Sequence, residues 1–159
     1  MAEALSRTND QETDILVTLV QESEALTALL VTKEGVLASQ AGDTSYLNVT
    51  ALAALVAAMF SATQEVARLV GEKHFSILLQ QGENRHIHIG LLPDSRMMVV
   101  VFEDAHRIGL VRHGARRAAE RLQALVKTRE QPAIPEGEIA TAEFKEYALS
   151  LVDRIFQVK

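Results

Sequence analysis

The sequence lacks cysteine altogether, and its 8 glycines are scattered singly. Without cysteine, the chain has no disulfides, thiolate metal sites or cysteine nucleophiles. Without a glycine-rich loop, it has neither a P-loop nor a Rossmann phosphate site. A nucleophile elbow, an H-E-x-x-H helix and an EF-hand loop are also missing. We therefore expect no catalytic residues, no metal and no cofactor.

Basic residues and long hydrophobic runs are scarce too. Lys and Arg number 16 against 21 Asp and Glu, which gives a net charge of −5. Because nucleic-acid binding relies on neutralising phosphates, we expect no nucleic-acid partner. The longest apolar run, Val49 to Phe60, is shorter than the roughly 20 residues that span a bilayer. Residues 1–11 lack the apolar segment of a secretory signal. We expect a cytoplasmic protein without membrane insertion.

The 159 residues are 48% hydrophobic and 23% charged, as in one ordinary folded domain. The hydrophobic pattern predicts helices at 10–24, 48–70, 108–127 and 138–156, strands at 26–32, 36–39, 75–81, 86–91 and 97–102, and a loop at 40–47. Short turns between strands indicate antiparallel pairing, and the run 97–102 is apolar enough for a central strand covered on both faces. The sequence therefore predicts an α/β fold of the α+β kind.

Helix-ending signals and prolines suggest how the chain is divided. Asn48 is a suitable N-cap for the long helix, and Gly71 is a suitable residue to end it. Prolines and a glycine in residues 131–137 interrupt helical structure there. We predict a flexible N-terminus at 1–9, a folded domain at 10–128, a linker at 129–137 and a tethered amphipathic helix at 138–159.

The long helix is the most informative element. One stripe is predicted to face the core: Leu52, Leu55, Val56, Met59, Thr63, Val66 and Val70. The other side is predicted to carry Ala54, Ala57, Ala58, Ser61, Ala62 and Glu65, which we call the platform residues. No charge occurs from Asn48 until Glu65, and small side chains let another protein approach closely. The platform thus predicts a contact surface, with simple alanine enrichment for helix propensity as the alternative.

Two polar groups have alternative interpretations. His86 and His88 share one side of a strand, so both could touch one ligand or metal, but no third ligand accompanies them and a solvent-facing strand side is the simpler interpretation. Arg112, Arg116, Arg117 and Arg121 cluster on the third helix. They form either an anion or acidic-partner surface or, as we favour, a solvated helix face.

Several segments, in this order and spacing, resemble the roadblock (dynein light chain) family and, within it, the MglB branch of bacterial roadblock proteins. They are Leu29-Leu30-Val31-Thr32-Lys33-Glu34-Gly35, Leu52-Ala53-Ala54-Leu55-Val56-Ala57, Ala67-Arg68-Leu69-Val70-Gly71-Glu72 with Phe75, Gln81-Gly82, Val99-Val100-Val101-Phe102, Gly109-Leu110-Val111-Arg112 and Arg117-Ala118-Ala119-Glu120. Each segment is weak alone, but together they extend from about Asp14 to Val126.

The resemblance implies a roadblock/profilin-like fold in which a five-stranded antiparallel sheet lies between helices. It also implies a homodimer joined through the third strands, with the two long helices side by side as a platform. Proteins of the MglB branch use this platform to bind a Ras-like small GTPase of the MglA type. They activate its GTP hydrolysis by ordering its switch loops, without supplying an arginine finger or other catalytic residue.

The resemblance further implies contacts from the C-terminal helix to the GTPase, for which Phe144, Leu151, Val152 and Ile155 are the candidate residues. It places the protein in cell polarity or gliding motility, with recruitment to a cell pole. Two alternatives stay open. One is a non-activating scaffold or localisation factor for a small GTPase. The other is a small-ligand sensor that uses the strand face of His86 and His88.

Overall fold

The computed structural model describes residues 1–130, 146, 149–151 and 153–154. The chain divides into two compact units, Met1–Leu125 and Val126–Lys159, and the fold presented below is that of the first. The helices are α1 (Ala2–Ser23), α2 (Val49–Leu69), the short 3-10 helix η1 (Ala105–Arg107) and α3 (Ile108–Glu130). The strands are β1 (Thr27–Val31), β2 (Leu37–Gly42), β3 (Ile77–Gln81), β4 (His86–Leu91) and β5 (Met97–Phe102).

The five strands form one antiparallel sheet in the order β2-β1-β5-β4-β3. The prediction of an α/β fold with antiparallel pairing is confirmed. The predicted central position of residues 97–102 is also confirmed, because β5 lies between β1 and β4 and all six of its residues are buried. A strand covered on both faces has no polar side to alternate with its apolar side.

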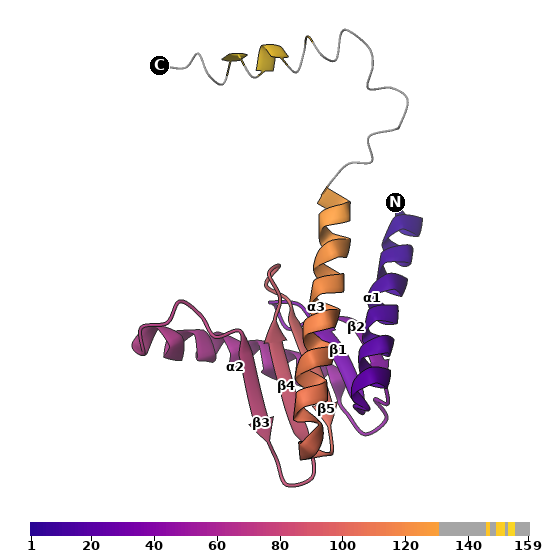
Figure 1. Cartoon of the computed structure of the whole chain (residues 1–159), viewed down its shortest axis with the longest axis vertical. Coiled ribbons are helices and arrows are strands. Elements are labelled where there is room, and N and C mark those ends of the chain that lie inside the picture. Colours follow the sequence, from indigo (N-terminus) through magenta and orange to yellow (C-terminus); the bar gives the residue numbers. More distant parts are fainter. Residues whose placement is uncertain (131–145, 147–148, 152, 155–159) are drawn as a thin grey trace. The chain divides into compact units, whose positions relative to one another are not determined.

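Helices cover both faces of the sheet, with α1 and α3 on one side and α2 on the other (Figure 1). The core under α1 and α3 includes Leu16, Leu19, Ala28, Leu30, Met98, Val100, Phe102, Val111, Ala115, Ala118 and Leu122. The core under α2 includes Leu29, Val31, Ala53, Val56, Phe60, Ile89, Met97 and Val99. Neighbouring residues of β1 and β5 thus alternate between the two cores, as strand geometry requires.

Several predicted boundaries are wrong. Helix α1 begins at Ala2 rather than at residue 10, so the predicted flexible N-terminus is helical from its second residue. The added turns are exposed, so no buried stripe marks them in the sequence. Strand β2 continues to Gly42, into the predicted loop, because it pairs with β1 as far as Thr27. Strand β3 begins at Ile77, two residues after the predicted start.

Helix α3 continues to Glu130, so the first two residues of the predicted linker are helical. The rest of the predicted linker and most of the predicted tethered helix lie outside the described residues. The same is true of Phe144, Val152 and Ile155, three of the four candidate contacts of that helix. The fourth, Leu151, is 42% exposed. The division of the chain at residues 128 and 137 stays a prediction.

Candidate protein interface

The long helix α2 forms where the sequence predicts it, because its ends carry the residues that helix ends require. The side-chain oxygen of Asn48 accepts a hydrogen bond from the backbone N–H of Ala51 at 3.0 Å. This bond satisfies one of the donors that a helix start leaves unpaired. At the other end, Gly71 has a φ of 80°, in the left-handed region that favours glycine. Both end predictions are confirmed.

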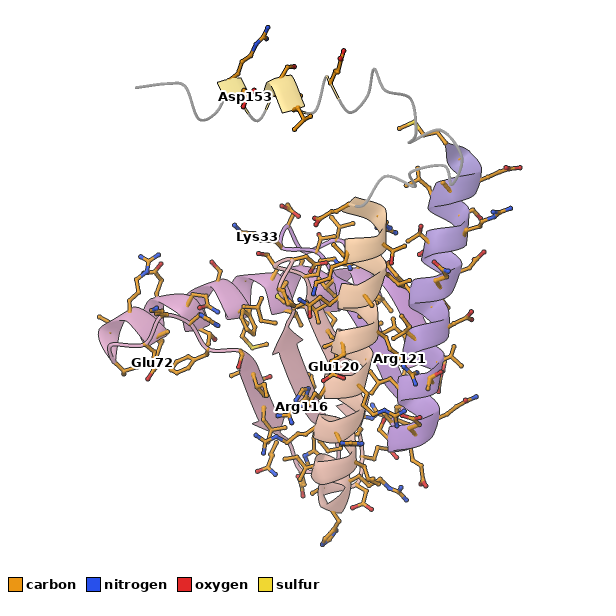
Figure 2. The ribbon with its side chains drawn as sticks, turned by 45° about the horizontal axis from the view of Figure 1, so that its top comes forward. Lys33, Glu72, Arg116, Glu120, Arg121 and Asp153 are labelled. Atoms are coloured by element: carbon orange, nitrogen blue, oxygen red, sulfur yellow. The ribbon has the colours of Figure 1, made fainter. Side chains whose placement is uncertain are left out.

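The buried face of α2 differs from the predicted core stripe. Helix α2 buries Ala53, Val56, Phe60 and Ala67, and the first three belong to the core that it shares with the sheet. Leu55, Val66 and Val70 belong to the predicted core stripe, yet they are 67%, 50% and 63% exposed. The prediction is wrong for these three residues. For Val66 and Val70 the exposure has a geometric cause, because the C-terminal half of α2 extends beyond β3 in both views (Figures 1 and 2).

The structure exposes five of the six platform residues, Ala54, Ala58, Ser61, Ala62 and Glu65, and half-buries Ala57. Part of the platform has a role within the protomer. A Cβ added to Gly35 would lie 3.0 Å from the Cα of Ala54 and 3.3 Å from the Cβ of Ala57. The small side chains at these two positions therefore let the β1–β2 turn pack closely on α2. Their role in binding another protein stays a prediction.

A second feature of α2 is missing from the sequence-based prediction. Leu55, Ala58, Ala62, Val66 and Leu69 are exposed and recur at intervals of three or four residues. They therefore form one continuous line along the helix, which we call the exposed α2 stripe. Leu69 is 86% exposed, and contiguous exposed apolar surface of this kind marks an interaction site. The signal was present in the sequence, since a helix that is apolar on every side must bury more than one face.

Strand β3 is an edge of the sheet next to the overhanging end of α2. Among the described strands it pairs with β4 alone, and its sequence Ile-Leu-Leu-Gln-Gln has no charge and no proline. Ile77 and Leu79 are 46% and 36% exposed. An edge strand without charge or proline is a template for pairing with another chain. The C-terminal half of α2 and the β3 edge thus lie in one region of the molecule (Figure 1).

By length and composition, α2 is the one helix among the described residues that could cross a membrane. A helix with one face in a protein core passes the same test. Here Val56 and Phe60 are buried with strand residues in the second core. We therefore interpret the apolar character of α2 as core packing on one face and an interface on another.

The two histidines of β4 are buried, whereas the simpler prediction placed them on a solvent-facing side of the strand. His86 and His88 are 5% and 2% exposed, so the expected solvent-facing strand side is wrong. The ring of His86 lies 5.2 Å, centroid to centroid, from the ring of Phe102. Burial, together with the positive charge of Arg112, lowers the pKa of His88 below its ordinary value of 6.5. Within the part of the chain that the structure describes, no group of three or more His, Cys, Asp or Glu could hold a metal ion.

The arginines on α3 are exposed, as the favoured prediction of a solvated face requires. Arg117 pairs with Glu22 of α1 at 3.4 Å, where both side chains are partly exposed. Exposed pairs of this kind add little stability. Arg112 and Arg116 differ from Arg117 and Arg121 in one respect, because they lie over a cavity between α3 and the sheet.

The Roadblock/LC7 domain profile matches residues 12–102. A search of curated proteins finds no significant match. Among solved structures, MglB of Myxococcus xanthus is 26% identical, with a TM-score of 0.73 over 78% of this chain and 93% of that chain. The gliding protein MglB of Thermus thermophilus is also 26% identical, with a TM-score of 0.70 over 76% and 91%. A structure of MglB with a tetrameric arrangement is 27% identical, with a TM-score of 0.69 over 76% and 90%.

Proposed function

The chain belongs to the Roadblock/LC7 family, and we propose that it is a homodimeric activator of a Ras-like small GTPase of the MglA type. The observation that carries this proposal is the exposed α2 stripe of apolar side chains, together with the free edge of β3. The likeness to MglB structures supports it at the level of the fold and the class of regulator.

The dimer step rests on β3 and α2 together. Two β3 edges that pair would satisfy each other's backbone groups and join two sheets into one. The overhanging halves of α2 would then meet, and the exposed α2 stripe would bury its apolar side chains against a second copy. Removal of such surface from water is the main driving force for association. The described residues of β3 contain no charge that would oppose this pairing.

The GTPase step rests on the platform residues that the dimer leaves accessible. Ser61 is small and exposed and does not belong to the exposed α2 stripe, so a partner's backbone could approach closely there. Glu65 would lie at the rim, where it pairs with Arg68 at 3.2 Å. A rigid surface that binds only the ordered form of a switch loop shifts the loop toward that form. The GTPase's own residues then supply the charge stabilisation that phosphoryl transfer needs.

The rest of the proposal follows from the same role. We propose that the protein acts in the cytoplasm, with recruitment to a cell pole, in the control of polarity or gliding motility. We also propose that the C-terminal helix contacts the GTPase through Phe144, Leu151, Val152 and Ile155. Regulation of this kind requires no catalytic residue, metal or cofactor in the roadblock subunit.

Single-turnover GTP hydrolysis tests the proposal. The MglA-type GTPase of the same genome is loaded with GTP, and phosphate release is followed with and without the full chain. We expect faster release with the chain present, and binding to the GTP-loaded form in a pull-down. Binding without acceleration would favour the scaffold alternative. Absence of binding to both the GTP-loaded and the GDP-loaded form would overturn both.

A further inference from the structure

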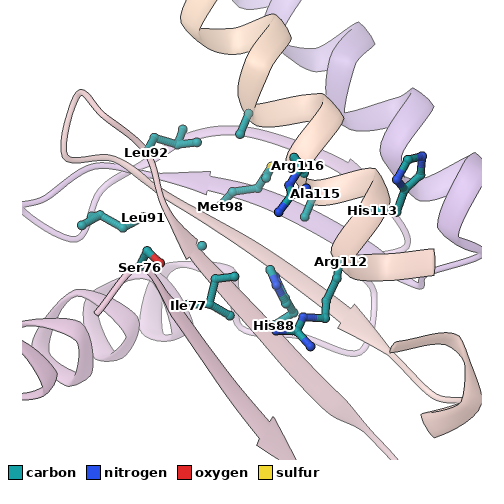
Figure 3. A pocket seen from close by; sticks show the side chains of 12 residues that line it. Ser76, Ile77, His88, Leu91, Leu92, Met98, Arg112, His113, Ala115 and Arg116 are labelled. Atoms are coloured by element: carbon teal, nitrogen blue, oxygen red, sulfur yellow. The ribbon is translucent and has the colours of Figure 1, made fainter. Parts of the chain in front are cut away.

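A cavity of about 450 Å³ lies between α3 and the sheet, on the face opposite α2 (Figure 3). Its volume is within the range of small-molecule sites. Its apolar walls come from Ile77, Leu91, Leu92, Met98, Ala115 and Ala119. Among the described residues, no Asp or Glu lines it. The feature does not depend on the proposed GTPase regulation, because no platform residue takes part.

A glycine on β4 creates the space. Gly90 follows His86 and His88 on the same side of the strand, at a position where any other residue would place a side chain in the cavity. A Cβ added there would meet only the Cε1 atom of His88, at 3.7 Å. That distance is ordinary contact, so neither backbone strain nor crowding requires glycine at this position.

A buried polar side chain lies at the inner end of the cavity. His88 is 2% exposed, and neither of its ring nitrogens has a hydrogen-bond partner among the described residues. Its ring points from β4 toward α3 and lies close to Arg112 (Figure 3). Buried polar atoms are nearly always hydrogen-bonded, so two unpaired nitrogens beside a cavity indicate a missing partner. A neutral imidazole can offer one donor and one acceptor.

Two cations border the same cavity. Arg112 and Arg116 are one helical turn apart on α3, and neither takes part in an ion pair among the described residues. Guanidinium groups bind carboxylate and phosphate oxygens through paired hydrogen bonds. His113 adds a further nitrogen to the lining. The polar part of the lining therefore consists of these basic side chains and the neutral hydroxyl of Ser76, with no acidic group among the described residues.

We propose that this cavity binds a small organic anion with an apolar body, whose anionic oxygens pair with Arg112 and Arg116 while His88 hydrogen-bonds to the same ligand. Carboxylates and phosphate monoesters share this chemistry. The apolar body would occupy the space above Gly90, against Ile77 and Met98 of the neighbouring strands. The sequence-based sensor hypothesis named both histidines, but only His88 lines the cavity.

Titrations with matched eight-carbon compounds test the proposal. Octanoate and octyl phosphate are added to the full chain, with octan-1-ol and octylammonium as controls, all below micelle-forming concentration. Binding is followed by amide NMR shifts and by calorimetry. We expect saturable shifts at Gly90 and at the start of α3 with one or both anions, and at least tenfold weaker binding of the two controls.

Three variants make the test specific. Arg112→Gln with Arg116→Gln should weaken anion binding at least tenfold. Arg121→Gln should leave it unchanged, because Arg121 lies on the side of α3 nearer α1 (Figure 2). Gly90→Val should abolish binding by filling the cavity, with circular dichroism and thermal unfolding as checks on its fold. Loss of binding in Gly90→Val supports the proposal only if that variant is folded. If it is not folded, the double variant of Arg112 and Arg116 decides the test.

Several results would overturn the proposal. Equal binding of octan-1-ol would show that no anion is recognised. Shifts confined to Leu55 or Leu69 would mean that octanoate adsorbs to the exposed α2 stripe instead. The proposal would also be overturned if neither anion bound at millimolar concentration. It would likewise be overturned if the arginine double variant bound the anions as well as the unchanged chain.

Discussion

At the scale of single residues, His88 shows how burial changes a group that the sequence presents as ordinary. A strand side of alternating histidines is typical of a solvent-facing surface, yet α3 covers it here. Burial disfavours the charged imidazolium, and the charge of Arg112 adds to this effect, so the pKa of His88 is lowered. The folded protein therefore favours the neutral form of His88.

The lowered pKa predicts how stability depends on pH. The unfolded chain binds a proton at this residue near pH 6.5, whereas the folded chain binds it only at lower pH. The free energy of unfolding therefore contains the full contribution of neutral His88 above pH 6.5. This contribution is lost as the pH falls toward the pKa of His88 in the folded chain, by at most about 1.4 kcal/mol per pH unit. Urea unfolding between pH 5 and 8 measures this loss, and His88→Gln should reduce it. An identical pH dependence in that variant would contradict the prediction.

Gly35 and Gly71 form a matched pair for a second prediction. Both have a positive φ, 82° and 80°, but a Cβ at Gly35 would crowd Ala54 and one at Gly71 would meet nothing within 4 Å. Gly71→Ala should therefore cost only the backbone strain of roughly 1–2 kcal/mol. Gly35→Ala should cost at least about 1 kcal/mol more, because it adds overpacking against α2. Urea unfolding at one protein concentration compares the two variants. Equal losses of unfolding free energy would mean that the β1–β2 turn moves to accommodate the added methyl group without cost.

At the scale of elements, α2 illustrates where sequence reasoning succeeds and where it fails. Its limits were predictable because Asn48 and Gly71 act through local backbone chemistry. Its buried face was not, because apolar residues surround the helix and the pattern alone cannot say which side meets the sheet. Val66 and Val70 have the composition of core residues, but they lie where α2 has no sheet beneath it.

The platform on α2 gives the third prediction. Ser61→Arg should leave the protomer folded, because Ser61 is exposed. It should weaken GTPase binding at least about tenfold, since a charge buried without a partner costs several kcal/mol. Ser6→Arg is the matched control, because Ser6 is an exposed helical serine on α1. A pull-down with the GTP-loaded GTPase measures the effect, and normal binding by Ser61→Arg would show that the platform is elsewhere.

At the scale of the whole molecule, the question is which part of the chain carries dimerisation. The exposed α2 stripe and the β3 edge both belong to the unit Met1–Leu125. Deletion of residues 131–159 should therefore leave the dimer intact. Light scattering after size-exclusion chromatography measures the mass of both forms. A monomeric truncated chain alongside a dimeric full chain would show that the C-terminal segment completes the interface.

The sequence by itself determined the order of elements, the central strand and the ends of the long helix. These features depend on hydrophobic period, turn residues and caps, which act over a few neighbouring positions. Only the tertiary structure decided that α2 overhangs the sheet, that His88 is buried, and that Gly90 opens a cavity beneath two arginines. Each of those depends on which surfaces meet across the fold, and a local pattern holds no information about the distance between residues far apart in the chain.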